Sequence, residues 1–164
     1  MAGNVEKVET VVIGGGHAGL TMSYSLSQVG REHVILERGR VGERWRSERW
    51  DSFHFQFPNW TIELPGYKYQ CADLDAFAPG HEVVGFLDGY AGFINAPVRC
   101  GVTVMSLEQG SREGRYLIRT QNGSIEAGTC SDRHGSISRA GTSGDRCRGS
   151  RRRLPGPFKQ VPRS

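Results

Sequence analysis

The sequence has no long hydrophobic run and no closely spaced metal ligands. Apolar residues make up 37% of the 164 residues, and no run of them approaches the roughly 18 residues that cross a bilayer. The four cysteines include no CxxC pair and the five histidines show no HExxH spacing, which argues against a zinc site and a dense disulfide framework. We therefore expect no metal, no membrane span and unpaired thiols.

The N-terminal region also lacks the apolar core of a signal peptide. Glu6, Lys7 and Glu9 stand directly before the first hydrophobic stretch, where a secretory signal would continue its apolar segment. We expect a cytoplasmic protein.

A net positive charge is found only in the C-terminal part of the chain. Residues 130–164 hold nine Lys or Arg and two Asp, whereas residues 1–129 hold 12 basic and 15 acidic residues. The C-terminal part is rich in Arg, Ser and Gly and has too few apolar residues to offset the conformational entropy of ordering. We predict one domain over 1–129 and a disordered tail over 130–164.

The basic tail raises the question of nucleic acid. Arginines bind phosphates, but Phe158 is the only aromatic residue in the tail that could stack on a base. We expect a solvated tail rather than a nucleic-acid partner.

The most informative stretch is a hydrophobic strand that breaks into a glycine-rich turn. Residues 11–19 read VVIGGGHAG, which is a GxGxxG pattern. A helix is predicted from His17 to Val29, closed by Gly30, and a second strand over His33–Leu36 follows. Strand, glycine turn, helix and strand in this order form the first βαβ unit of a dinucleotide-binding domain.

Each residue type in the turn has a physical role. Gly14 permits the tight turn, Gly16 lacks a Cβ that would collide with a pyrophosphate, and Gly19 lets the helix pack closely on the sheet. The helix, which starts at His17 and Ala18, aims its free N–H groups at the anion. The His17 side chain itself is interpreted as solvent-facing rather than catalytic.

The second strand ends on an acid. Glu37 lies 18 residues past Gly19, near the spacing at which a carboxylate accepts hydrogen bonds from ribose hydroxyls. Because a carboxylate repels the 2′-phosphate of NADP, Glu37 favours the unphosphorylated ribose of FAD or NAD.

The rest of the first 129 residues predicts a further helix and several strands. Aromatic and polar residues alternate over 50–58, which indicates a short strand or extended segment ending at Pro58. Turns are expected at Pro65-Gly66 and Pro79-Gly80. The periodicity then predicts a helix over 82–94 and an antiparallel meander over 102–107, 116–120 and 124–127, with Asn122-Gly123 as a hairpin turn.

Four segments in fixed order resemble the flavin-containing monooxygenase family, including the CzcO-like bacterial flavoproteins. They are VVIGGGHAGLTMSYSL, HVILERGRVGERWR, FPNWTIELPGYKY and HEVVGFLDGYAGFINAPVRCGVTV, within residues 8–128. The resemblance implies the first half of an α/β, Rossmann-like FAD-binding fold: a parallel sheet with helices and a small antiparallel β-meander, here incomplete. It implies that FAD is held by Gly14, Gly16, His17, Ala18, Gly19, Glu37, Arg38, Gly42 and Trp45.

The roles implied for Gly42, Trp45 and Asn59 depend on the resemblance alone. Gly42 and Trp45 are similar to the GGxW element beside the flavin, although Val41 stands in place of its first glycine. Asn59 is similar in position to an asparagine near the flavin ring and nicotinamide, where an amide can both donate and accept. From the residues alone, Asn59 is equally well a turn residue after Pro58.

In this family NADPH reduces FAD, and a flavin hydroperoxide transfers one oxygen atom of O2 to a small-molecule substrate. The cofactor performs the chemistry, so the absence of an evident catalytic acid or nucleophile is consistent with the resemblance. Substrate and oligomeric state stay open.

Three family features are missing after Thr129: the VVxATG strand, the FxGxxxH signature and the second GxGxxG, which binds NADPH. One choice of codons for residues 130–134, read one base later, encodes Val-Val-Thr-Gly, which suggests a frameshift. We therefore expect a truncated FAD-binding chain whose activity alone is uncertain. Two alternatives are a fragment of an NAD-dependent reductase, although no CxxxxC pair follows the first helix, and a non-catalytic product with an exposed sheet edge.

Overall fold

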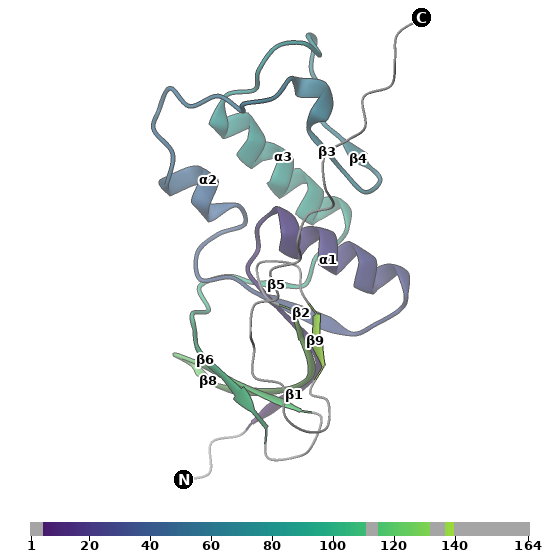
Figure 1. The fold of residues 1–164 in the computed structure, drawn as a ribbon, viewed down its shortest axis with the longest axis vertical. Coiled ribbons are helices and arrows are strands. Elements are labelled where there is room, and N and C mark those ends of the chain that lie inside the picture. Colours follow the sequence, from purple (N-terminus) through teal and green to yellow (C-terminus); the bar gives the residue numbers. More distant parts are fainter. Residues whose placement is uncertain (1–4, 111–114, 132–136, 140–164) are drawn as a thin grey trace, which may run out of the picture.

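Hydrophobic strands at the start of the chain form the centre of a mixed sheet, with the helices above it in Figure 1. The computed structural model describes residues 5–110, 115–131 and 137–139. Within these residues the sheet has seven strands, in the order β5-β2-β1-β8-β7-β6, with β9 paired to β8. The strands are β1 (Glu6–Ile13), β2 (His33–Leu36), β5 (Val98–Arg99), β6 (Val104–Gln109), β7 (Tyr116–Thr120), β8 (Gly123–Ser131) and β9 (Ile137–Arg139).

Shorter elements and helices complete the architecture. The helices are α1 (His17–Gln28), α2 (Glu43–Ser47), α3 (Gly80–Phe93) and the 3-10 turn η1 (Asn59–Thr61). A separate hairpin pairs β3 (Glu63–Leu64) with β4 (Tyr67–Lys68). No helix in the described part of the chain is long and apolar enough to span a membrane.

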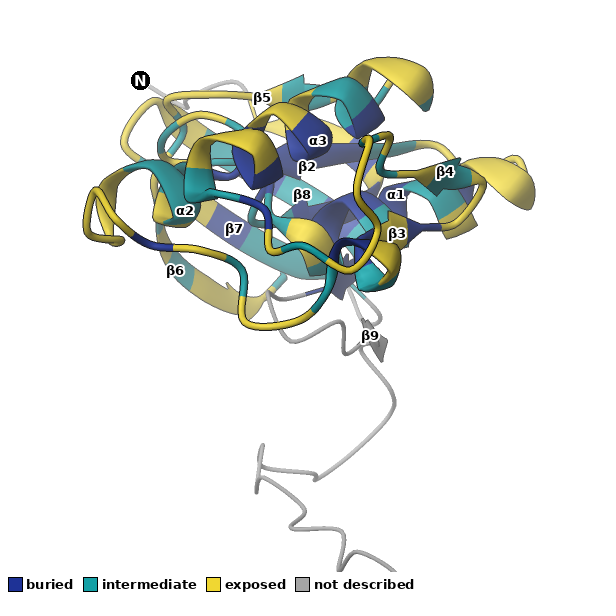
Figure 2. Ribbon diagram, turned by 90° about the horizontal axis from the view of Figure 1, so that it is seen from above, coloured by how far each residue is buried: buried dark blue, intermediate teal, exposed yellow. Residues whose placement is uncertain are grey.

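The central strands are buried on both faces, as the continuous apolar run VVI predicts. β1 pairs in parallel with β2 and with β8, and successive side chains on a strand point to opposite faces. Val12 and Ile35 pack in the cluster that includes Leu20 of α1, whereas Val11 and Val34 pack in a second cluster with the meander. Burial on both sides is typical of parallel strands. Figure 2 shows the buried residues concentrated on these inner strands and on the inward faces of the helices.

The first helix ends where the sequence predicts. Gly30 has φ 65° and donates to the Ser27 carbonyl at 3.0 Å, and Arg31 donates to the Leu26 carbonyl at 2.9 Å. These two bonds form a Schellman motif, which satisfies the last carbonyls of the helix and requires a residue that tolerates positive φ. The glycine therefore ends α1 and turns the chain toward β2.

The last long strand, β8, has two different partners along its length. It pairs antiparallel with β7 from Gly123 to Ala127, and in parallel with β1 from Ile125 to Ser131. Cys130 and Ser131 are 2% and 1% exposed, so the sheet continues two residues past the boundary expected at Thr129. Beside β1, on the side away from β2, the sheet holds β8. Most of the predicted tail, residues 132–136 and 140–164, lies outside the described residues.

Several local predictions need correction. The segment 50–58 forms no strand: it turns at residues 51–52 and bends at 56–57, and its one bridge joins His54 to Pro79. α3 begins at Gly80, two residues before the predicted start. The β7–β8 hairpin turns at Gln121 and Asn122, because Thr120 pairs with Gly123. Short elements set by tertiary contacts, namely β5, α2 and the β3–β4 hairpin, were not predicted.

We predict that a charge at Cys130 disrupts the sheet. Cys130→Asp would place an unpaired carboxylate in a buried strand and lower the free energy of unfolding by about 3 kcal/mol or more. Cys100→Asp, at an exposed position, is the matched control and should change it by less than about 0.5 kcal/mol. Urea unfolding followed by circular dichroism measures both, and equal stabilities would contradict the placement of Cys130 in the sheet.

Candidate dinucleotide-binding site

Gly14, Gly16 and Gly19 differ in whether the structure leaves space for a side chain. Gly14 has φ 106°, and its N–H donates to the Leu36 carbonyl at 2.8 Å. A Cβ on Gly19 would lie 1.9 Å from the Gly14 carbonyl oxygen, whereas a Cβ on Gly16 would have no atom within 4 Å. The structure itself therefore requires glycine at positions 14 and 19, but it leaves open space in front of Gly16.

The start of α1 presents backbone N–H groups that have no partner among the described residues, beside this space. Gly16 is the N-cap and no side chain caps the helix. The Leu20 N–H bonds to the Gly16 carbonyl at 3.0 Å, so the N–H groups of His17, Ala18 and Gly19 precede the first helical bond. Free amides at a helix start, with the positive end of the helix dipole, attract an anion.

Glu37 lies beside the same turn and is partly bound to it. One carboxylate oxygen accepts the Gly15 N–H at 2.6 Å, and the other accepts the Gly39 N–H at 2.9 Å. A carboxylate has about four acceptor positions, so further hydrogen bonds can be accepted. Sequence reasoning assigned no role to Gly15, but a Cβ there would come within 3.1 Å of the Glu37 Cβ. The three consecutive glycines at residues 14–16 are the sequence feature that could have indicated this close contact.

A second loop is attached to the first through Gly42. Its N–H donates to the Gly15 carbonyl at 3.1 Å, its φ is 65°, and a Cβ there would lie 3.1 Å from Leu87. Trp45 follows on α2, where its ring packs against Phe53 and Phe55 with centroids 5.8 and 6.0 Å apart. One backbone hydrogen bond therefore joins the two loops.

Arg38, Arg40 and Arg44, around this loop, are paired with acids. Hydrogen bonds from the Arg40 side chain and, with less effect, from its backbone N–H lower the pKa of Glu43 to about 2. Glu48 accepts from Arg44 at 2.6 Å, which lowers its pKa, and from Arg38 at 3.4 Å. Because these cations already have partners, the helix amides are the main unpaired donors for an anion.

One pocket of about 750 Å³ unites the predicted residues. Its lining includes the whole set predicted for cofactor binding: Gly14, Gly16, His17, Ala18, Gly19, Glu37, Arg38, Gly42 and Trp45. The volume is within the range of small-molecule and cofactor sites. Sequence reasoning missed Glu43, Arg44 and the stretch Val102–Val104, which also line it; the last joins the site only through the fold.

Asn59 is not among the lining residues of this pocket. It is 5% exposed; its backbone N–H donates to the Ala76 carbonyl at 2.9 Å, and its Nδ2 donates to the Asp73 carbonyl at 2.8 Å. Its Oδ1 is buried and has no hydrogen-bond partner within the described part of the chain. These contacts join η1 to the loop that contains Asp73 and Ala76. The role of Asn59 beside a flavin stays a prediction.

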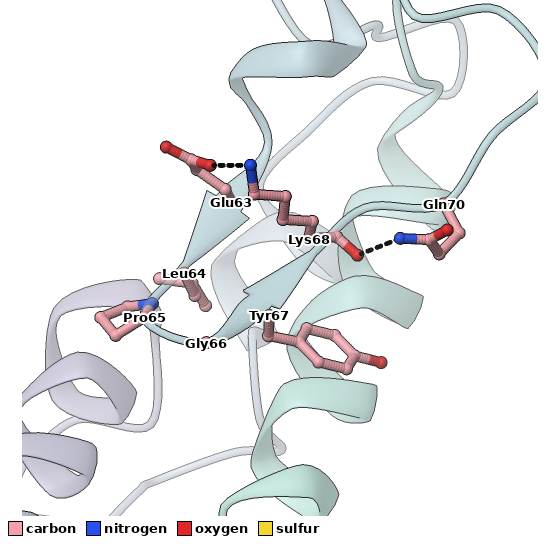
Figure 3. Close-up of a pocket in the computed structure, with 7 residues that line it drawn as sticks. All are labelled: Glu63, Leu64, Pro65, Gly66, Tyr67, Lys68 and Gln70. Carbon is pink, nitrogen blue, oxygen red and sulfur yellow. Dashed lines mark hydrogen bonds and ion pairs between the residues drawn. The ribbon is translucent and has the colours of Figure 1, made fainter.

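A second hollow, of about 760 Å³, lies over the β3–β4 hairpin. Figure 3 shows that its lining comes from the hairpin itself and Gln70, with Lys68 reaching Glu63; their ion pair spans 3.5 Å. Polar groups from different elements do not converge there, so we do not assign it a ligand. Across the described residues, no three His, Cys, Asp or Glu side chains gather as a metal site.

Comparisons with known proteins agree with this geometry. Residues 12–73 match the NAD(P)-binding Rossmann-like domain. The oxidoreductase CzcO of Bacillus subtilis is 30% identical over 113 residues, which are 68% of this chain and 32% of that protein. The flavin-containing monooxygenase of Stenotrophomonas maltophilia is 25% identical, with a TM-score of 0.70 over 78% of this chain and 38% of its own.

A third comparison concerns the fold alone. The bacillithiol disulfide reductase of Staphylococcus aureus has a TM-score of 0.70 at 16% identity. The Rossmann-like fold and the resemblance to flavin monooxygenases are thus confirmed. This chain spans about a third of the length of the curated relatives that it matches.

We predict that two glycine substitutions in the turn have different effects on stability. Gly19→Ala would clash with the Gly14 carbonyl and lower the free energy of unfolding by about 2 to 3 kcal/mol. Gly16→Ala meets no atom and has an ordinary backbone conformation, φ −92°, so its cost as an N-cap change should stay below about 1 kcal/mol. Chemical denaturation compares the two, and a reversed order would contradict the geometry of the turn.

Proposed function

We propose that this chain is the FAD-binding part of a flavin-dependent oxidoreductase of the flavin monooxygenase kind. The observation that carries the proposal is the single pocket in which the free amides of α1, the open face of Gly16 and the Glu37 carboxylate meet. The sequence relatives and structural neighbours, which include an oxidoreductase and a flavin monooxygenase, support the same function.

The residues of the pocket fit the adenosine diphosphate half of FAD. The N–H groups of His17, Ala18 and Gly19 would donate to the pyrophosphate, which can approach because Gly16 has no side chain. Glu37 would accept hydrogen bonds from the adenosine ribose while it keeps its bonds to Gly15 and Gly39. Gly42, Arg38 and Trp45 would border the cofactor.

The flavin and the protein would contribute different things to the reaction. Bound flavin supplies electron transfer and oxygen chemistry, whereas the protein binds and orients it. We assign to this chain the binding step alone; NADPH, O2 and a small-molecule substrate belong to the reaction of complete flavin monooxygenases.

NAD is the alternative ligand for the same pocket. The amides and Glu37 suit the adenosine diphosphate that FAD and NAD share, and the matching domain family is described as NAD(P)-binding. The flavin monooxygenase neighbours favour FAD. Direct titration distinguishes the two ligands.

We predict that Gly16→Ala loses FAD without losing its fold. Its methyl group would occupy the space required by the pyrophosphate, so the Kd for FAD should rise by about tenfold or more, which corresponds to about 1.4 kcal/mol. Calorimetric titration of the purified protein with FAD measures this, with Gly85→Ala in α3, where a Cβ would meet no atom within 4 Å, as a control for loss of a glycine. Wild-type protein that binds neither FAD nor NAD would refute the proposed function.

We further predict that the charge of Glu37 sets the preference between ribose types. Glu37→Gln keeps the shape but removes the negative charge, so binding of FAD and NAD should weaken while binding of NADP improves relative to NAD. Competition titrations give the NAD to NADP ratio of Kd values. If this ratio is unchanged, Glu37 does not contact the ribose.

A further inference from the structure

One wall of the dinucleotide pocket is a short stretch of irregular backbone, residues 101–103, between β5 and β6. Val102 and Thr103 line the pocket, and Gly101 has φ 72°. The Val102 N–H donates to the Glu37 carbonyl at 2.9 Å, so the wall lies directly beside the acid. Irregular backbone keeps one shape only when its polar groups are bound by other parts of the protein.

The Gly101 N–H donates to the Gly39 carbonyl at 3.3 Å, and Gln121 supplies three further bonds to this wall. Its Nε2 donates to the Gly101 carbonyl at 2.6 Å, and its Oε1 accepts the Thr103 N–H at 2.6 Å. Its backbone N–H also donates to the Thr103 carbonyl, at 3.3 Å. A primary amide is suited to this position because it carries a donor and an acceptor on one planar group.

The position of the wall indicates which part of a ligand would touch it. In FAD and NAD the pyrophosphate is followed by ribose and then by adenine. If the pyrophosphate binds at the start of α1 and the ribose at Glu37, the base comes next, and the wall is hydrogen-bonded to Glu37 itself. The base would therefore lie against Val102, Thr103 and Val104.

We propose that Gln121 is a positioning residue for the base of the dinucleotide. It fixes the wall from the turn between β7 and β8, without itself belonging to the lining of the pocket. This inference rests on the proposed function, because it assumes that the pocket holds a dinucleotide. Gln121 is exposed, so removal of its side chain should not open the core.

The test compares ligands with and without a base. We would titrate FAD, ADP and inorganic pyrophosphate into wild type, Gln121→Ala, Gln121→Glu and, as a control in the same turn, Asn122→Ala. Loss of two hydrogen bonds to the wall should raise the Kd of Gln121→Ala for FAD and ADP by about tenfold. The Kd for pyrophosphate should not change, and Asn122→Ala should bind all three ligands like wild type.

Amide hydrogen exchange at Thr103 gives an independent readout. The Thr103 N–H should exchange faster in Gln121→Ala. In Gln121→Glu it should stay protected, because the acceptor oxygen remains while the donor to Gly101 is lost, and the affinity for ADP should be intermediate. The exchange rates report only the hydrogen bonds of the wall, so the order of the ADP affinities is what distinguishes positioning of the base from a purely structural role of Gln121.

The possible failures are distinguishable. Wild-type affinity of Gln121→Ala for FAD and ADP would overturn the inference, and so would an equal loss for pyrophosphate and ADP. Failure of wild type to bind any of the three ligands would overturn the proposed function, and the inference with it.

Discussion

The chain of hydrogen bonds through Gly15 links the three segments that form the pocket. Its N–H donates to the Glu37 carboxylate at 2.6 Å, and its carbonyl accepts the Gly42 N–H at 3.1 Å. The first bond joins the turn after β1 to the end of β2, and the second joins it to the loop before α2. Because Gly15 has no side chain, the three segments approach closely enough for both bonds to form.

The paired charges around the pocket restrict how an anion can be bound. Arg40 and Arg44 are committed to Glu43 and Glu48, and such exposed ion pairs contribute little to stability. They do, however, reduce the number of free cations near the pocket. Attraction for a pyrophosphate then depends on the amides of α1, whose geometry is set by packing of the helix on the sheet.

β8 belongs both to the antiparallel meander and to the parallel centre of the sheet. The same strand leaves the meander and continues beside β1, where Thr10 faces Thr129 and Val11 faces Cys130. The VVxATG pattern does not occur in β8. The hydrogen bonds of a strand nevertheless come from its backbone, which any residue except proline can provide. The meander and the central sheet are therefore continuous, and Gln121 in the meander reaches the wall of the pocket.

The sequence by itself determined the βαβ unit and the residues predicted to contact a dinucleotide. Those residues are close in sequence, and their spacing follows from local rules: glycine where φ is positive or backbones touch, helical periodicity after His17, and an acid at the end of the second strand. The tertiary structure alone decided that β8 runs on to Ser131, that Asn59 holds a loop outside the lining of the pocket, and that Val102–Val104 and Gln121 belong with the site. Each of these depends on contacts between segments far apart in the chain, and no local pattern of residue types specifies which distant backbone group completes a hydrogen bond.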